Sequence, residues 1–357
     1  MLHLKYLLSL IFMKKGEDID YISKKKPAFP VTADLRSYIK EYDREADLPV
    51  LYKDLKRYTS SFPLYNKEGE DTLWETIMFE KSDLDEINKG LAKTYALLRT
   101  AGNLSVMEHL YINRIDYCTF GNSNPFRIRI VNQFNDNYDY FYVKKADSSR
   151  IYGLELEHML SPNRINYLVD KNTLVEDHIA GIPGDQFIKD YLYRSTTNKV
   201  RIAKEFIKFN ERCFVRLLGD MRSYNYVIDI TPDFEDEQYR VRAIDFDQQS
   251  YEGKRTLYQP QFFKENNPIV QFCIDLITNE TVKQYQQEER TLMAKRVYSS
   301  RYKLKDLLDC MRANQISTPA KIEQLKKGLN AHHKTSVFNE CTSMGDVVRL
   351  HLKVLLN

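Results

Sequence analysis

The stretch Cys213–Gln248, CFVRLLGDMRSYNYVIDITPDFEDEQYRVRAIDFDQ, carries two acidic sites, each at the edge of a short apolar segment. The first site is Asp220, followed five residues later by Asn225, and the second is the triplet from Asp245 to Asp247. A hairpin between the two apolar segments would bring Asp220, Asn225 and Asp245 to one rim. Carboxylate and amide oxygens suit a hard cation such as Mg2+, which is commonly shared with phosphate oxygens. The stretch therefore predicts phosphoryl-transfer chemistry.

These two sites resemble the catalytic loop and the metal-binding triplet of the protein-kinase-like superfamily. The loop of that family has an Asp, four residues and an Asn, as in Asp220 to Asn225. The Gly-Asp start and the Asp-Phe-Asp triplet look more like aminoglycoside phosphotransferases and bacterial toxin-type kinases than like eukaryotic protein kinases. Arg222 stands where protein kinases carry a Lys near the γ-phosphate, so the loop leaves the substrate class open.

Three segments upstream have the composition and alternation of β-strands. They are residues 114–120, 126–131 and 138–144. In the family, such a meander begins the amino-terminal lobe, and its first turn covers the nucleotide phosphates with backbone N–H groups. The resemblance thus implies phosphate contacts from Gly121, Asn122 and Ser123. An ordinary hairpin loop is an equal alternative for these residues.

Two lysines, Lys144 and Lys145, end the third strand, and only one can face the cleft because strand side chains alternate. Lys144 stands at the usual family position. In the family, an acid on the following helix pairs with this lysine, which then holds the α- and β-phosphates. Glu155 fits the inner face of the helix expected over residues 150–160, and Glu157 is the alternative.

The order of these motifs along the chain resembles that of the family, and the resemblance implies an α+β, bilobal protein-kinase-like fold. Residues 111–181 would form a small antiparallel-sheet N-lobe, and residues 182–357 a helical C-lobe. Between them, Glu176 to Ile179 is similar to the hinge that binds the adenine edge, which makes Glu176 and His178 candidate nucleotide contacts. Residues 1–110 predict an α-helical N-terminal extension that packs on the catalytic unit or, equally, binds a protein partner.

The expected function is ATP- and Mg2+-dependent transfer of the γ-phosphate to a hydroxyl of an unidentified small molecule or protein Ser/Thr. Asp220 would orient the acceptor hydroxyl and accept its proton, and Arg222 would offset charge on the transferring group. Asn225 and Asp245 would bind Mg2+, with Asp247 holding a second ion.

Two alternative functions stay open. A pseudokinase that serves as a nucleotide- or protein-binding scaffold is favoured by the single glycine of the first turn, Gly121. It is also favoured by Leu218, which replaces the usual His or Tyr before the loop. The intact set of ionic residues favours an active enzyme instead. A kinase-fold nucleotidyl transferase would use the same set.

Composition limits the partners and the compartment. The 53 Lys and Arg residues nearly balance 50 Asp and Glu residues, so no nucleic-acid partner is expected. Five scattered cysteines without a CxxC pair predict free thiols in a reducing cytoplasm. The apolar segment from Leu2 to Phe12 is too short to span a bilayer. Either Met13 is the start or this segment packs as a helix, and a weak membrane anchor is a further alternative.

Overall fold

The larger β-sheet is built from segments in which apolar and polar side chains alternate. Phe126, Ile128 and Ile130 of strand β4 (Phe126–Asn132) are buried, and the arginines between them are half-buried, because successive strand side chains point to opposite faces. The same alternation in β5 (Tyr138–Lys145) buries Phe141 and Val143 in the sheet's core. It turns the neighbouring Lys144 to the other face.

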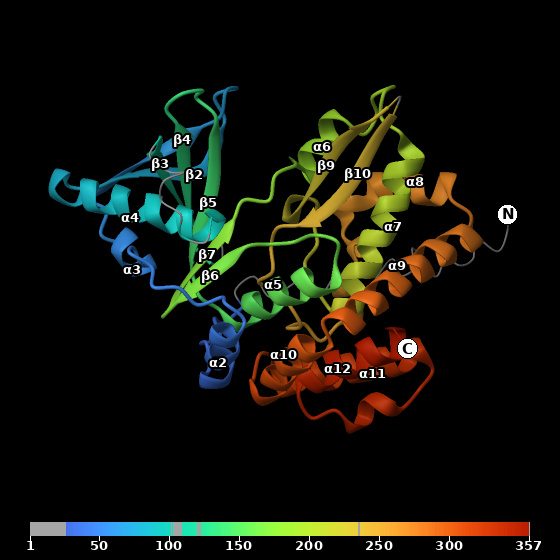
Figure 1. The fold of residues 1–357 in the computed structure, drawn as a ribbon. Coiled ribbons are helices and arrows are strands. Elements are labelled where there is room, and N and C mark those ends of the chain that lie inside the picture. The colour runs from blue at the N-terminus through green and yellow to red at the C-terminus, as the bar shows by residue number, and fades with distance from the viewer. Residues whose placement is uncertain (1–25, 101, 103–108, 120–122, 235, 357) are drawn as a thin grey trace.

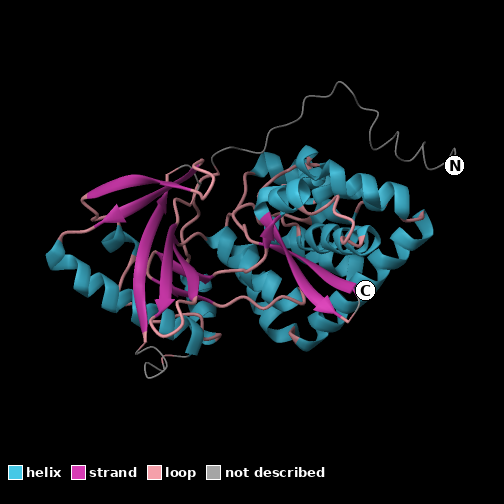
Figure 2. Ribbon diagram, turned by 90° about the horizontal axis from the view of Figure 1, so that it is seen from above, coloured by secondary structure: helices cyan, strands magenta, loops and turns pink. Residues whose placement is uncertain are grey.

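The computed structural model describes residues 26–100, 102, 109–119, 123–234 and 236–356. The fold is α+β, with a seven-stranded antiparallel sheet in the order β1-β2-β3-β4-β5-β7-β6. Its strands are β1 (Ser60–Tyr65), β2 (Asp71–Met78), β3 (Leu110–Cys118), β4 (Phe126–Asn132), β5 (Tyr138–Lys145), β6 (Tyr167–Asp170) and β7 (Thr173–Asp177). Figure 1 shows this sheet beside a mainly helical part, and Figure 2 shows the same arrangement from above.

Helices pack on both parts of the molecule. Those that precede or accompany the large sheet are α2 (Ala33–Glu41), α3 (Tyr52–Leu55), α4 (Lys81–Thr100) and α5 (Ser148–Leu160). The later helices are α6 (Gly184–Asp190), α7 (Lys199–Arg216), α8 (Asn267–Leu276), α9 (Asn279–Ser299), α10 (Arg301–Ala313), α11 (Pro319–His333) and α12 (Met344–Leu356). Helix α4 buries Ile87, Leu91 and Leu98 in one core with the sheet. Helices α2 and α5 belong to the other core, which they share with the later helices.

Helix α7 delivers the chain to the loop that contains Asp220. Asn198 caps its N-terminus by accepting a hydrogen bond from the Arg201 amide. The helix ends at Leu217, whose φ of 54° lies in the left-handed region. The predicted hairpin follows as β9 (Tyr226–Asp233) and β10 (Asp236–Ala243), with Tyr226 opposite Ala243. A third strand, β8 (Ile182–Pro183), completes the smaller sheet.

The prediction of an α-helical N-terminal extension is wrong in one respect for the described part of residues 1–110, because this part also contains two strands beside α2, α3 and α4. Strands β1 and β2 form a hairpin that extends the large sheet through pairing of Trp74 with Cys118. The turn is closed by Asn66, whose side chain accepts hydrogen bonds from the amides of Glu68 and Glu70. The burial pattern that marks a strand is weak here, because β1 is an edge strand whose side chains are mostly exposed.

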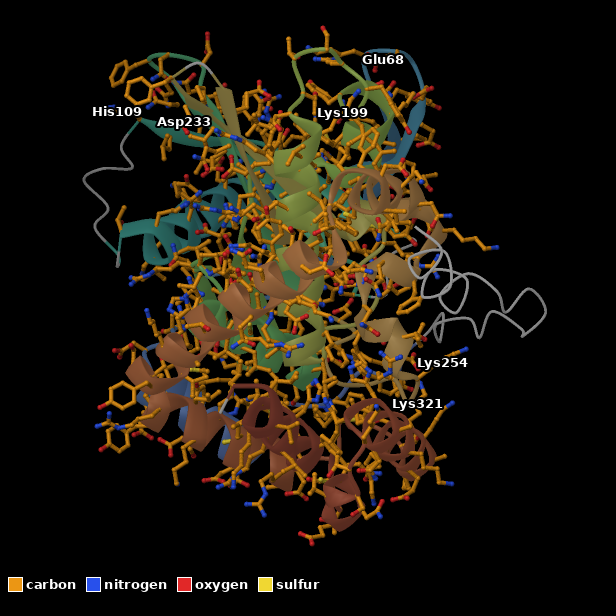
Figure 3. The ribbon with its side chains drawn as sticks, turned by 90° about the vertical axis from the view of Figure 1, so that its right-hand side faces the viewer. Glu68, His109, Lys199, Asp233, Lys254 and Lys321 are labelled. Atoms are coloured by element: carbon orange, nitrogen blue, oxygen red, sulfur yellow. The ribbon has the colours of Figure 1, made fainter. Side chains whose placement is uncertain are left out.

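The ends of the molecule can be followed in Figure 3. Lys199, at the start of α7, and Asp233, at the tip of β9, lie at one end, whereas Lys321 of α11 lies toward the other. Among the described residues, no helix is both long and apolar enough to cross a membrane. The apolar segment from Leu2 to Phe12 and Met13 lie outside the described residues.

Candidate functional site: a carboxylate-lined cavity

A cavity of about 410 Å³ lies between the large sheet and the start of the β9–β10 hairpin. Lysine, acidic, amide and aromatic side chains line it, and several of them are predicted site residues. The predicted residues in its wall are Ser123, Lys144, Glu176, His178, Asn225, Asp245 and Asp247. Glu155, Asp220 and Arg222 are not part of the wall. Gly121 and Asn122 lie outside the described residues.

Lys144 is buried in this wall, and its Nζ donates to Glu176 Oε2 over 2.6 Å. Lys145 is exposed, as alternation along β5 requires. Glu176 lies on β7, which pairs with β5 and sets Tyr142 opposite Glu176. Burial opposes ionisation of Glu176, but Arg150 and Lys144 outweigh it and hold the pKa of this carboxyl below its usual value. The predicted hinge residue is therefore the partner of the strand lysine.

The predicted pairing of Glu155 with Lys144 is wrong. Arg150 and Leu154, one turn apart on α5, face the cavity, so Glu155 points to a different side of the helix. Its carboxylate is fully buried and has four partners outside the cavity. They are Tyr38 at 2.7 Å, Tyr167 at 2.8 Å, Lys303 at 2.8 Å and Arg44 at 2.9 Å.

The alternative, Glu157, is also directed away from Lys144. It forms a buried ion pair with Arg216 of α7 and accepts a hydrogen bond from Asn163. Both acids of α5 thus join the helix to its neighbours, and neither reaches the cavity.

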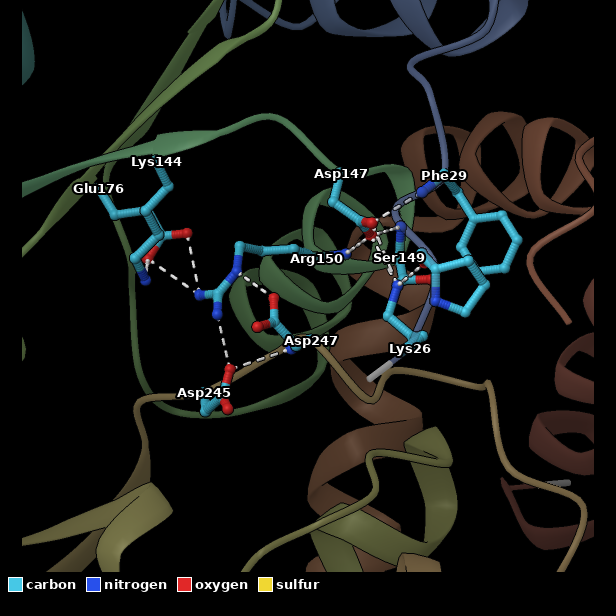
Figure 4. Close-up of polar contacts among 10 residues, drawn as sticks. Lys26, Phe29, Lys144, Asp147, Ser149, Arg150, Glu176, Asp245 and Asp247 are labelled. Carbon is cyan, nitrogen blue, oxygen red and sulfur yellow. Dashed lines mark hydrogen bonds and ion pairs between the residues drawn. The ribbon is translucent and has the colours of Figure 1, made fainter. Parts of the chain in front are cut away.

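Arg150, in the first turn of α5, is the residue that α5 sends into the site (Figure 4). Its Nε donates to Asp247 Oδ1 over 2.7 Å, and Nη2 donates to Asp245 Oδ1 over 2.6 Å. Its Nη1 lies 3.2 Å from Glu176 Oε1. Burial disfavours the charged guanidinium, but the carboxylates, Asp247 first, raise the pKa of Arg150 well above its usual value.

The two aspartates of the triplet differ in electrostatics. Burial opposes ionisation of Asp247, but Arg150 outweighs it and holds the pKa of Asp247 below its usual value. Burial and the charge of Asp247 instead raise the pKa of Asp245 above its usual value. The side chain of Asp245 is also more exposed than that of Asp247, at 32% against 10%.

Close packing of α5 on the triplet explains why Arg150 reaches both aspartates. A Cβ atom added to Gly153 would lie 2.9 Å from Cβ of Phe246, closer than side chains normally approach. Asp147 caps the same helix by accepting hydrogen bonds from the amides of Ser149 and Arg150. Lys26 Nζ lies 3.1 Å from Asp147, so the N-terminal segment contacts the start of the helix (Figure 4).

The loop from Asp220 to Asn225 lies beside the triplet. Asn225 Nδ2 donates to the Asp220 carbonyl over 2.7 Å, and the Asn225 carbonyl accepts from the Ile244 amide over 3.0 Å. These bonds join the loop to the residue before Asp245. Burial, followed by the charge of Asp245, raises the pKa of Asp220 to about 7. A carboxylate with such a pKa can exchange a proton near neutral pH, as a general base does.

Arg222 is directed at acidic side chains of its own chain. Its Nε donates to Asp220 Oδ1 over 2.9 Å, and its Nη1 donates to Glu265 Oε1 over 2.7 Å. The structure therefore places Arg222 as a group that holds Asp220. Its predicted contact with a transferring phosphoryl group would require these bonds to change.

Sequence reasoning missed Arg150, Glu265 and the aromatic residue Trp74, which lines the cavity from β2. For Arg150 a signal was present, because a cation in the first turn of a helix opposes the helix dipole and needs acidic partners. Glu265 lies 45 residues beyond Asp220 and carried no such signal. His178 lines the cavity beside Tyr142, and burial lowers the pKa of its imidazole, which favours the neutral form.

Comparison with known proteins did not identify a family for this chain. No protein-family model matched the chain, and no curated protein matched it. Fold and site together define an α+β protein with an ionic cavity between a seven-stranded sheet and a short hairpin. Function is inferred below from that cavity.

Proposed function

We propose that this protein is an ATP-dependent phosphotransferase that moves the γ-phosphate to a hydroxyl of a small molecule or of a protein Ser/Thr. One observation carries the proposal. Lys144, Asn225 and Asp245 line one cavity, and Asp220 lies on the adjoining loop, joined to Asn225 by a hydrogen bond. Phosphoryl transfer needs this combination of a cation for phosphates, oxygen ligands for a metal and a nearby base.

The order of elements supports the same proposal. A three-stranded meander is followed by α5, the β6–β7 hairpin, α7, the Asp220 loop and the triplet, as the resemblance to protein-kinase-like enzymes implies. The family's acid–lysine pair has a counterpart in Glu176 and Lys144, although the acid comes from β7 and not from the helix.

Each residue has a physical role in the proposed reaction. Lys144, held by Glu176, would bind phosphate oxygens as a point charge. Asp220 would orient the acceptor hydroxyl and accept its proton, while Arg222 holds the carboxylate in place. The aromatic side chains of Trp74 and Tyr142 supply apolar surface in the same wall.

The donor set fits one Mg2+ better than two. Asp245 is half-exposed to the cavity and Asn225 lines it, so both can offer oxygen ligands. Asp247 fits as a ligand of a second ion less well, because Arg150 binds Oδ1 of both aspartates but the Asp247 side chain is only 10% exposed, against 32% for Asp245. Among the described residues, no three His, Cys, Asp or Glu side chains form a metal-binding cluster. A bound Mg2+ would neutralise charge on the phosphates.

A second candidate is a scaffold that binds nucleotide without transferring it. The observation that favours it is the guanidinium of Arg150, which already neutralises part of the carboxylate cluster. In that case the cavity would bind ATP, and Asp220 would have no catalytic role.

The test uses ATP labelled separately on the α- and γ-phosphates, incubated with panels of small-molecule and protein acceptors. We expect transfer of the γ-label alone, and a loss of about 10²- to 10⁴-fold in the Asp220→Asn variant with nucleotide affinity retained. Asp275→Asn, at an exposed position of α8, is the matched control. Transfer of the α-label would indicate nucleotidyl transfer. Nucleotide binding without any transfer would select the scaffold, and failure to bind ATP would refute both.

A further inference from the structure

The guanidinium of Arg150 lies among three carboxylates that line the cavity. Its three nitrogen atoms each face a different carboxylate, namely Asp247, Glu176 and Asp245. Two of these three acids are the residues predicted to hold metal ions. A fork of fixed N–H donors thus fills the space between them.

The charges of the cluster leave room for one further cation. Lys144 and Arg150 contribute two positive charges, and Glu176, Asp245 and Asp247 contribute three negative charges when ionised, which leaves one negative charge. The exposed fractions of the side chains show where this charge faces. Arg150, Glu176, Lys144 and Asp247 are 3%, 6%, 8% and 10% exposed, whereas Asp245 is 32% exposed.

The backbone of α5 around Arg150 is also held in place. Asp147 accepts a hydrogen bond from the Arg150 backbone amide, and the close contact of Gly153 with Phe246 sets the distance between α5 and the triplet. An arginine stays protonated at every physiological pH, so this charge cannot be removed by titration. A divalent ion at Asp247 would have to reach a side chain that is only 10% exposed and lies against this guanidinium, whereas Asp245 is 32% exposed.

We propose that Arg150 takes the place of a second divalent cation, so that the site holds a single metal ion, bound through Asp245 and Asn225. The inference deepens the proposed function and rests on it for the presence of the nucleotide. Arg150 then acts as a positioning residue that fixes the number of metal ions, and its charge helps to balance the phosphates.

The test counts bound Mn2+ by electron paramagnetic resonance in the full-length protein, with and without a non-hydrolysable ATP analogue. We expect one Mn2+ per chain in the wild type with the analogue. Arg150→Met should bind one more ion than the wild type in either condition, because it exposes Asp247 and Asp245 together. Lys145→Met is the control: it removes a positive charge from the exposed position next to Lys144 and should leave the number of bound Mn2+ ions unchanged.

Two ions in the wild type, or an unchanged count in folded Arg150→Met, would overturn the proposal. If the analogue does not bind, the proposed function fails, and the titration without nucleotide still decides the role of Arg150. If Arg150→Met does not fold, Asp247→Asn decides it. Asparagine there should leave one Mn2+ bound with the analogue, and a lost ion would make Asp247 a metal ligand.

Discussion

Replacing Glu155 with glutamine separates a packing role for this residue from the catalytic role that its sequence position predicts. Glutamine keeps the volume and one oxygen acceptor but removes the charge. Glu155 is fully buried and forms ion pairs with Arg44 and Lys303, in addition to hydrogen bonds from Tyr38 and Tyr167. We expect a loss of stability with nucleotide affinity preserved.

The size of the loss follows from the surroundings of the two cations. Removing one partner of a buried ion pair costs about 3–5 kcal/mol, because the other charge stays buried without compensation. The side chains of Arg44 and Lys303 keep 12% and 21% of their exposure, so water can partly compensate them. The lower end, about 3 kcal/mol, is therefore expected. In a chain of this size, that corresponds to a decrease of roughly 4 °C in Tm.

The assay combines urea denaturation with titration of a fluorescent ATP analogue. Glu323→Gln is the control, because Glu323 is 59% exposed in its pair with Lys326 and should contribute less than about 1 kcal/mol. Glu176→Gln should instead weaken binding of the ATP analogue, since it leaves Lys144 without the acidic partner that holds it in place. Unchanged stability of Glu155→Gln together with lost nucleotide binding would refute this reasoning.

Three further predictions follow from individual side chains. Lys144→Met should weaken binding of the ATP analogue at least about tenfold, since a charge-assisted contact is worth about 1.5–3 kcal/mol, and an unchanged Kd would contradict its role. Trp74 is the chain's only tryptophan and lines the cavity, so its fluorescence should change saturably on nucleotide addition, with no change in Trp74→Phe. Burial lowers the pKa of His351 to about 3. The unfolded chain then binds a proton below about pH 6.5 that the folded chain does not, so the free energy of unfolding should fall by about 1.4 kcal/mol per pH unit below that value. His351→Gln should reduce the overall slope by this amount in denaturation at pH 7, 6 and 5, while His332, whose pKa is lowered to about 4 by burial, keeps its own contribution. An unchanged slope would exclude His351 as a contributor.

The parts of the site that depend on local order were predictable from the sequence. Helix α7 has strong amphipathic spacing, and the β9–β10 hairpin has strand-like alternation on both sides of a polar turn, so the proximity of Asn225 and Asp245 could be inferred. Alternation along β5 allowed only one of its two lysines to face the cavity, and the resemblance selected Lys144, which the structure places there. These features depend only on neighbours along the chain.

The parts that depend on how α5 is rotated were not predictable. Glu155 and Arg150 both lie on this helix. The packing of the helix against Phe246 and α10 decides which of the two contacts Glu176, the partner of Lys144. The β1–β2 hairpin was missed for a related reason. Its register is set by pairing with β3, more than thirty residues away, and its outer strand carries little burial pattern.

The four partners of Glu155 also limit how far α5 can move away from the cavity. They come from α2, the segment after it, β6 and α10, so α5 is tied to elements from both ends of the described chain. Swinging the helix outward would break these contacts, at a cost of about 3 kcal/mol or more. A cost of that size keeps the displaced population below about 1%. An inhibitor that captures a displaced helix would therefore lose affinity in proportion to that population, whereas a competitor for the cavity itself would not.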